Sequence, residues 1–263
     1  MRWRRSGDNS DVIDERASGG GTGLPIGLPT AGGGLGLIGV LVFLAIQLLG
    51  GGGSSAAFGP QTVPGAPQAE DGLRDFSVYV FHDTQKFWEQ RISGYKHAKL
   101  VLYRGGVDTG CGSATSAVGP FYCPRDQRVY LDLSFYNDMT GQLGAKGGDF
   151  AWAYVIAHEM GHHVQQQLGL ARPRTNAESV QVELQADCYA GVWASHVEGA
   201  GDLQAGDVAE ALDAASSVGD DRIQKRATGS IHPDSFTHGT SAQRVAAFER
   251  GKANGDPNDC RSA

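Results

Sequence analysis

The chain has 263 residues and a formal net charge of −7, from 22 Lys and Arg against 29 Asp and Glu. This acidic balance argues against a nucleic-acid partner, because binding to phosphates normally requires a basic patch. Of the 39 glycines, 17 fall within residues 1–66, so the first quarter lacks the composition of an ordinary folded domain. The remaining residues are enough for one globular domain, predicted over residues 73–256.

The N-terminal quarter divides into three predicted segments. Residues 1–34 mix arginines, acids and glycines without apolar periodicity, which predicts a disordered tail. Residues 35–53 contain a strongly apolar stretch flanked by glycines, which we interpret as a transmembrane anchor. A cleaved signal peptide and a buried core helix are the alternatives. Residues 54–72, rich in Gly, Pro, Ser and Ala, are expected to form a flexible linker.

Charge around the apolar stretch predicts its orientation. Arg2, Arg4 and Arg5 precede it, and no Lys or Arg occurs between it and Arg74. Because cytoplasmic flanks carry the excess of Lys and Arg, we expect a single-pass membrane protein with a cytoplasmic N-terminus. The domain would then be extracytoplasmic, in the periplasm or at the cell exterior, and residues 35–53 would contact the lipid bilayer.

Cysteine usage agrees with export. The four cysteines, Cys111, Cys123, Cys188 and Cys260, all follow the apolar stretch. A disulfide between Cys111 and Cys123 would close a short loop and stabilise the fold by about 3 kcal/mol, leaving Cys188 and Cys260 as the second pair. The alternative is four reduced thiols in a cytosolic protein. A cysteine zinc site is not expected, since no Cys-x-x-Cys occurs.

Apolar spacing in the remaining chain predicts several helices and a few short strands. The expected helices are 73–91, 150–168, 176–197, 207–217 and 241–250, and the expected strands include 98–103 and 129–136. Asp149 is a plausible N-cap for the second helix, which Gly169 ends. The expected fold is therefore α+β, mainly helical with a small sheet.

The most informative segment is His158-Glu-Met-Gly-His162. On a helix, residues four apart project from the same face, so both imidazoles can bind one metal ion. Glu159 lies beside that face, where a carboxylate can act as a general base. The segment therefore predicts a catalytic metal site.

A catalytic zinc site requires a third protein ligand and one open position. Leu168 stands where metzincins have a third histidine, so we expect a glutamate from a second helix, as in other zincins. Glu183 lies in a predicted helix, and Asp187 follows it on the same face, where it can accept a hydrogen bond from a ligand histidine. The alternative is that both are solvated acids on a helix surface.

At these residues the chain resembles the bacterial family called putative neutral zinc metallopeptidases, membrane-anchored relatives of gluzincins. The likeness covers about residues 73–250 and the anchor. It is carried by the motifs His158-Glu-Met-Gly-His162, Glu183-Leu-Gln-Ala-Asp187-Cys-Tyr-Ala-Gly191, Gly119-Pro-Phe-Tyr-Cys-Pro124 and Ser235-Phe-Thr-His-Gly-Thr-Ser241. The resemblance implies a zincin-like fold and one Zn²⁺ per chain.

The mechanism expected from these residues is peptide hydrolysis. Zn²⁺ held by His158, His162 and Glu183 would lower the pKa of its water toward about 7, and Glu159 would take the proton.

The developing oxyanion needs one more donor besides the metal. By analogy with other membrane-linked gluzincins, His238 and Arg244 are the candidates. The alternative for Arg244 is an ion pair with Asp187 or contacts with helix-end carbonyls.

The sequence leaves alternatives open for how a substrate binds and for the function. We expect residues 129–136 to form an edge strand that pairs with an extended protein or peptide substrate; an interior strand is the alternative. A membrane-anchored zinc endopeptidase is the preferred function, ahead of a non-catalytic, zinc-stabilised envelope scaffold and a zinc amidase acting on another substrate.

Overall fold

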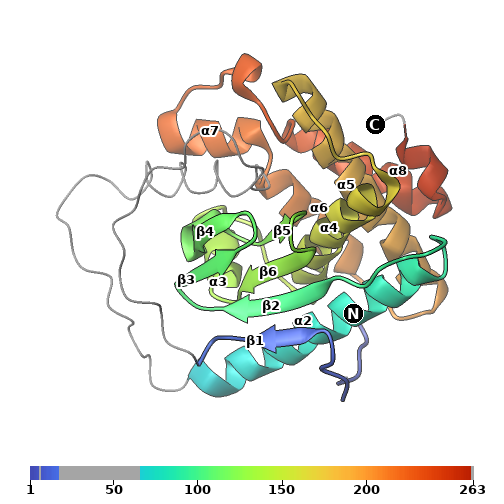
Figure 1. Ribbon diagram of the computed structural model, residues 1–263. Coiled ribbons are helices and arrows are strands. Elements are labelled where there is room, and N and C mark those ends of the chain that lie inside the picture. The colour runs from blue at the N-terminus through green and yellow to red at the C-terminus, as the bar shows by residue number, and fades with distance from the viewer. Residues whose placement is uncertain (6, 18–65, 262–263) are drawn as a thin grey trace.

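The computed structural model describes residues 1–5, 7–17 and 66–261 (Figure 1). These residues form a mixed α+β architecture, mostly helical with a small sheet, which confirms the predicted fold class. The predicted membrane anchor, residues 35–53, lies outside the described residues. Within the described part of the chain, every helix is too short or too polar to cross a bilayer.

The central sheet has four strands in the order β1, β2, β6, β5. Strands β1 (Val12–Asp14), β2 (Lys99–Tyr103) and β6 (Arg128–Asp132) run parallel, and β5 (Phe121–Cys123) is antiparallel to β6. Apart from Lys99, every residue of β2 is buried, which is typical of a strand inside a mainly parallel sheet. Strands β3 (Gly106–Thr109) and β4 (Gly112–Thr115) form a separate antiparallel hairpin.

The prediction of an edge strand over residues 129–136 is wrong both in the length of the strand and in its position in the sheet. Strand β6 stops at Asp132, whose carboxylate accepts a hydrogen bond from the Ser134 backbone at 2.9 Å and turns the chain into helix α3 (Phe135–Thr140). Because β6 lies between β2 and β5, it is interior, and its backbone groups pair within the sheet. On this side of the described sheet, β5 is the outer strand.

The described residues contain six longer helices, which are arranged with the sheet as Figure 1 shows. They are α2 (Ala66–Glu89), α4 (Asp149–Leu168), α5 (Asn176–Gly199), α6 (Asp207–Ser217), α7 (Asp220–Thr228) and α8 (Ser241–Asn254). Helix α2 begins inside the segment predicted to be a linker, and α7 was not predicted. Asp149 is the first residue of α4 rather than its N-cap, which is Gly148. Three short 3₁₀ turns, Ser116–Val118, Pro233–Ser235 and Pro257–Cys260, complete the elements of the described residues.

Helix α4 is the centre of the core. All residues from Phe150 to Gln165 are buried, because α2, α5 and α6 pack around it. Gly161 allows the closest approach to α5: a Cβ there would meet the Ala186 carbonyl oxygen at 2.9 Å. Because this stretch of α4 is enclosed, its polar side chains are held in fixed positions, which suits a site built from two of its histidines.

Both predicted disulfides are present. Cys111–Cys123 joins the tip of the β3–β4 hairpin to β5. Cys188–Cys260 fastens the C-terminal 3₁₀ turn to α5.

The prediction of a disordered tail is wrong for the described residues of 1–17. Val12 and Ile13 pair with Leu100 and Val101 in the parallel β1–β2 ladder. Trp3 packs against Phe76 of α2, with ring centroids 5.4 Å apart. The prediction failed because it rested on the average composition of the first quarter, in which these few apolar residues carry little weight. They nevertheless add a strand to the sheet and an aromatic contact to α2.

Candidate metal centre

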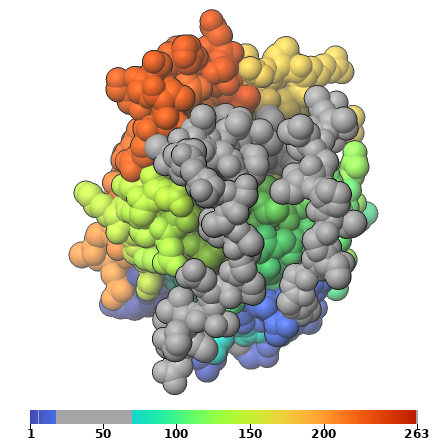
Figure 2. Space-filling model, turned by 90° about the vertical axis from the view of Figure 1, so that its left-hand side faces the viewer, coloured from blue at the N-terminus to red at the C-terminus, as the bar shows by residue number. Residues whose placement is uncertain are grey.

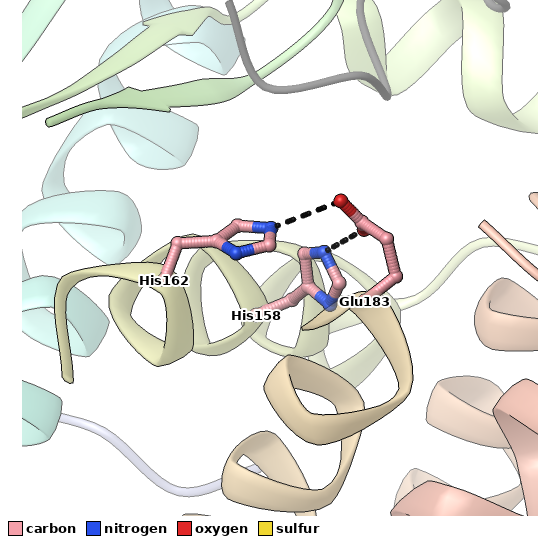
Figure 3. Close-up of side chains that lie close together, drawn as sticks. All are labelled: His158, His162 and Glu183. Carbon is pink, nitrogen blue, oxygen red and sulfur yellow. Dashed lines mark ion pairs between the residues drawn. The ribbon is translucent and has the colours of Figure 1, made fainter. Parts of the chain in front are cut away.

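Three predicted ligands meet between α4 and α5. His158 and His162 extend from one face of α4 toward the Glu183 carboxylate of α5 (Figure 3). His158 Nε2 lies 3.2 Å from Glu183 Oε2, and His162 Nε2 lies 3.6 Å from Glu183 Oε1. One ligand atom from each of the three residues can be chosen so that all lie within 4.8 Å of one another.

The hydrogen bonding of these atoms fits a cation. His158 Nε2, His162 Nε2 and Glu183 Oε2 are all buried without a hydrogen-bond partner. Unsatisfied buried polar atoms are costly, so three that converge on one point indicate a missing common partner. Two imidazoles and one carboxylate form the ligand set of a catalytic zinc site with an open position. The residues present therefore fit Zn²⁺.

Asp187 contacts His158 on the side of the imidazole ring that faces away from Glu183. Its Oδ1 accepts a hydrogen bond from His158 Nδ1 at 2.8 Å and another from the Tyr154 hydroxyl at 2.6 Å. With Nδ1 protonated, His158 Nε2 keeps its lone pair for a metal. The predicted contact between Asp187 and His158 is thus present, and Tyr154 is a further member of this network that the sequence did not reveal.

Buried charges around Asp187 shift its titration and that of its neighbours. Burial alone would raise the pKa of Asp187, but Arg244 and His158 lower it to about 2. Burial alone would lower the pKa of His158, but Asp187 and Glu183 raise it to about 9. Burial likewise opposes ionisation of Glu183, yet His162, His158 and His238 hold its pKa well below the usual range. The Asp187 and Glu183 carboxylates thus favour a positive charge at His158.

Glu159 follows the first ligand histidine, as the motif predicts. It is buried, and burial raises the pKa of its carboxyl group, while His158 and His162 act in the opposite direction. The backbone of Tyr122, in β5, also lowers this pKa. Glu159 is thus close both to the two histidines and to β5, the outer strand on this side of the described sheet.

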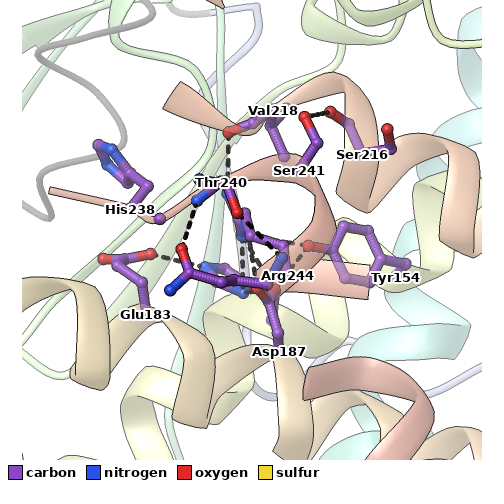
Figure 4. A network of polar contacts seen from close by, with 12 residues as sticks. Tyr154, Glu183, Asp187, Ser216, Val218, His238, Thr240, Ser241 and Arg244 are labelled. Carbon is purple, nitrogen blue, oxygen red and sulfur yellow. Dashed lines mark hydrogen bonds and ion pairs between the residues drawn. The ribbon is translucent and has the colours of Figure 1, made fainter. Parts of the chain in front are cut away.

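His238, in the segment that precedes α8, lies near Glu183 (Figure 4). Asp220, at the start of α7, holds it: Asp220 Oδ1 is 3.1 Å from His238 Nδ1, and Oδ2 accepts the backbone N–H groups of Thr237, His238 and Gly239. His238 Nε2 is buried and has no hydrogen-bond partner. Sequence reasoning missed Asp220, because α7 is short and has only two apolar residues, Ile223 and Ala227, to mark it as a helix.

Arg244 is placed differently from the predicted oxyanion donor. Its guanidinium is buried and donates to both Asp187 oxygens, to the Tyr154 hydroxyl and to the Val218 carbonyl (Figure 4). It is 3.4 Å from His158 Nδ1, on the side of the ring away from the metal-binding nitrogen. The expectation that Arg244 stabilises an oxyanion is therefore corrected: its donors are committed to Asp187 and its neighbours, as in the alternative considered for it.

Comparisons with known proteins agree with this site. The family model described as "Putative neutral zinc metallopeptidase" matches residues 1–263. The chain is 44% identical over its full length to the uncharacterized protein YpfJ of Escherichia coli K12, covering 98% of that protein. It is 46% identical over 189 residues, 66% of this chain, to the uncharacterized protein Rv2575 of Mycobacterium tuberculosis, covering 64% of it. No solved structure matches the chain significantly.

Proposed function

Because the chain belongs to the putative neutral zinc metallopeptidase family, we propose that it hydrolyses peptide bonds at a zinc ion held by His158, His162 and Glu183. The observation that carries the proposal is the convergence of three buried ligand atoms, none with a hydrogen-bond partner, beside a buried glutamate. A purely structural zinc site would close its fourth position with a protein ligand and would not need Glu159.

Zn²⁺, when bound, supplies a Lewis acid that polarises a carbonyl and lowers the pKa of a coordinated water. Glu159 acts as the general base of the proposed reaction. Its burial raises the pKa of the carboxyl group toward the working pH, which improves proton transfer in both directions. It accepts a proton from the attacking water and delivers it to the leaving amine.

His238 is the proposed donor to the oxygen that becomes negatively charged. Its buried Nε2 has no partner, and Asp220 accepts from Nδ1, so the ring is oriented before substrate binds. A preorganised donor in a site shielded from water stabilises developing charge more than a mobile one does. Arg244 contributes indirectly, because it fixes Asp187 and thereby His158.

Strand β5 is the proposed guide for an extended protein or peptide substrate. It is the outer strand on its side of the described sheet, and the backbone of Tyr122 reaches Glu159. Pairing along a strand edge gives affinity through main-chain hydrogen bonds with little demand on side chains. Replacing one backbone amide of a good peptide substrate by an ester should weaken binding, and equal affinity of amide and ester would contradict this part.

The test of the proposed function is a Glu159→Gln variant of the full chain. The substitution keeps the shape of the side chain and all three zinc ligands, so zinc content should stay at one per chain. Loss of the general base should lower kcat by a factor of about 10² to 10⁴. Peptide cleavage would be profiled on a proteome-derived peptide library with wild type and variant in parallel.

Two results would contradict the proposal. Undiminished cleavage by the Glu159→Gln variant would rule out the assigned base. Zinc binding without peptide cleavage by the wild type would favour the scaffold or a hydrolase of other amide bonds.

A further inference from the structure

His162 is oriented by a neutral amide, whereas His158 is oriented by a carboxylate. His162 Nδ1 lies 2.9 Å from Gln165 Oε1. Gln165 is fully buried, and its amide nitrogen donates to the Val182 carbonyl at 2.6 Å and to Gln185 Oε1 at 3.1 Å. Because the amide hydrogens have these two acceptors, the oxygen faces His162 and accepts from Nδ1. The metal-binding nitrogen of His162 is thereby Nε2.

This chain of amides ends at the C-terminal disulfide. Gln185 donates through Nε2 to the Cys260 carbonyl at 3.0 Å. Cys260 is buried in the last 3₁₀ turn, which is bonded covalently to α5 through Cys188. The acceptor for Gln185 is therefore held in place by the disulfide.

We propose that the Cys188–Cys260 disulfide positions His162 for zinc through Gln185 and Gln165, so that zinc affinity depends on this disulfide. The side chains that orient a ligand histidine commonly change metal affinity 10- to 100-fold when they are removed. The inference rests on the proposed zinc site but not on peptide hydrolysis.

The test measures zinc affinity of the full chain by competition with a chromophoric chelator, without substrate. A Cys188→Ser/Cys260→Ser variant and a Gln185→Leu variant should each bind zinc about 10- to 100-fold more weakly than wild type. Gln185 is partly exposed, so its replacement by Leu should leave the fold intact. The matched control is Cys111→Ser/Cys123→Ser, which removes the other disulfide, at the β3–β4 hairpin, and should leave zinc affinity unchanged.

Wild-type affinity in Gln185→Leu would overturn the proposal. Equal weakening by the two disulfide variants would also overturn it, because it would indicate a general loss of stability. Since zinc affinity is measured without substrate, an absence of peptidase activity bears only on the proposed function.

A second inference rests on the described residues of the N-terminal segment, 1–5 and 7–17, and on their contacts with the domain. The segment is fastened to the domain along its length: Arg2 N–H donates to the Asp202 carbonyl at 2.7 Å, and Arg5 forms a 2.6 Å ion pair with Asp75 of α2. Farther along, β1 pairs with β2. Figure 2 shows the blue N-terminal segment against green and cyan parts of the domain.

These contacts conflict with the predicted single crossing of a membrane. A crossing between this segment and the domain would separate them by a hydrocarbon layer of about 30 Å, whereas paired strands lie about 4.8 Å apart. We infer that residues 1–17 lie on the same side of any membrane as the domain, in place of the predicted arrangement with the N-terminus and the domain on opposite sides.

Accessibility of single cysteines tests this inference. Arg4→Cys and Ser230→Cys introduce thiols at two exposed positions, one in the N-terminal segment and one in the domain, and the parent chain with its four paired cysteines gives the background. A membrane-impermeant maleimide should label both variants from the same side, in intact spheroplasts or in inverted vesicles. Labelling of the two positions from opposite sides would overturn the inference.

Discussion

Asp187 Oδ1 lies 2.8 Å from His158 Nδ1, on the side of the imidazole opposite the nitrogen that faces Glu183. The carboxylate is itself held by Arg244, whose Nε is 2.8 Å from Oδ2. Both Asp187 and Arg244 are buried almost completely. The orientation of His158, a proposed metal ligand on α4, thus depends on an ion pair between α5 and α8.

An Asp187→Asn substitution should weaken zinc binding and the fold together. It keeps the shape of the side chain but removes the charge that balances Arg244, and an uncompensated buried charge costs about 3–5 kcal/mol. Zinc affinity should fall about 10- to 100-fold. Chelator competition and urea unfolding measure the two effects. Asp234→Asn, at an exposed position, is the control and should change neither; wild-type zinc affinity in Asp187→Asn would refute the role of Asp187.

An Asp220→Asn substitution should lower kcat while leaving KM and zinc affinity close to wild type. Asp220 touches none of the zinc ligands, but it accepts from His238 Nδ1 and so fixes which ring nitrogen carries the proton. Loss of one oriented donor to an oxyanion lowers kcat by about 10² to 10³. His238→Gln should give a loss of similar size. A parallel fall in zinc affinity would show instead that Asp220 only supports the fold.

Removal of zinc should lower the unfolding temperature. Zn²⁺ binds the three ligands in the folded state, so a free concentration 100 times Kd stabilises the chain by about 2.7 kcal/mol. A thermal scan with and without EDTA measures this difference. In a Glu183→Gln variant the same chelator should have a much smaller effect, because one ligand charge is missing. An equal shift in both proteins would mean that the metal binds elsewhere.

A Gly251→Ala substitution should destabilise the contact between α5 and α8. A Cβ at Gly251 would overlap the Cys188 carbonyl oxygen, a backbone atom that cannot move without shifting α5. Overpacking of this kind costs about 1–3 kcal/mol or more, measured by urea unfolding. The control is Gly199→Ala at the end of α5, where a Cβ meets nothing within 4 Å and helix propensity should add up to about 1 kcal/mol of stability. Equal stabilities for the two variants would contradict the close packing.

Much of the candidate metal site was predictable because it depends on local helical geometry. Residues four apart on a helix share a face whatever the surrounding fold, so the pairs His158/His162 and Glu183/Asp187 could be assigned roles before their helices were placed. The two cysteine pairs were predictable for a different reason, since the short spacing of one pair left the other as the remainder. Strand β2 was predictable because its run of apolar residues is continuous.

Other features depend on contacts between residues far apart in the chain. The Arg244 guanidinium suits an oxyanion or a carboxylate equally well, and only the packing of α8 on α5 decided that its Nε and Nη2 bind Asp187. Asp220 became recognisable only when α7 brought it to His238. Strand β6 is interior because β5 lies beside it. Strand β1 belongs to the same sheet although it is far from the other strands in the sequence. The sequence by itself determined which side chains could bind a metal ion, because that follows from residue type and helical period. The tertiary structure decided which buried charges face one another, because distant segments meet only through packing.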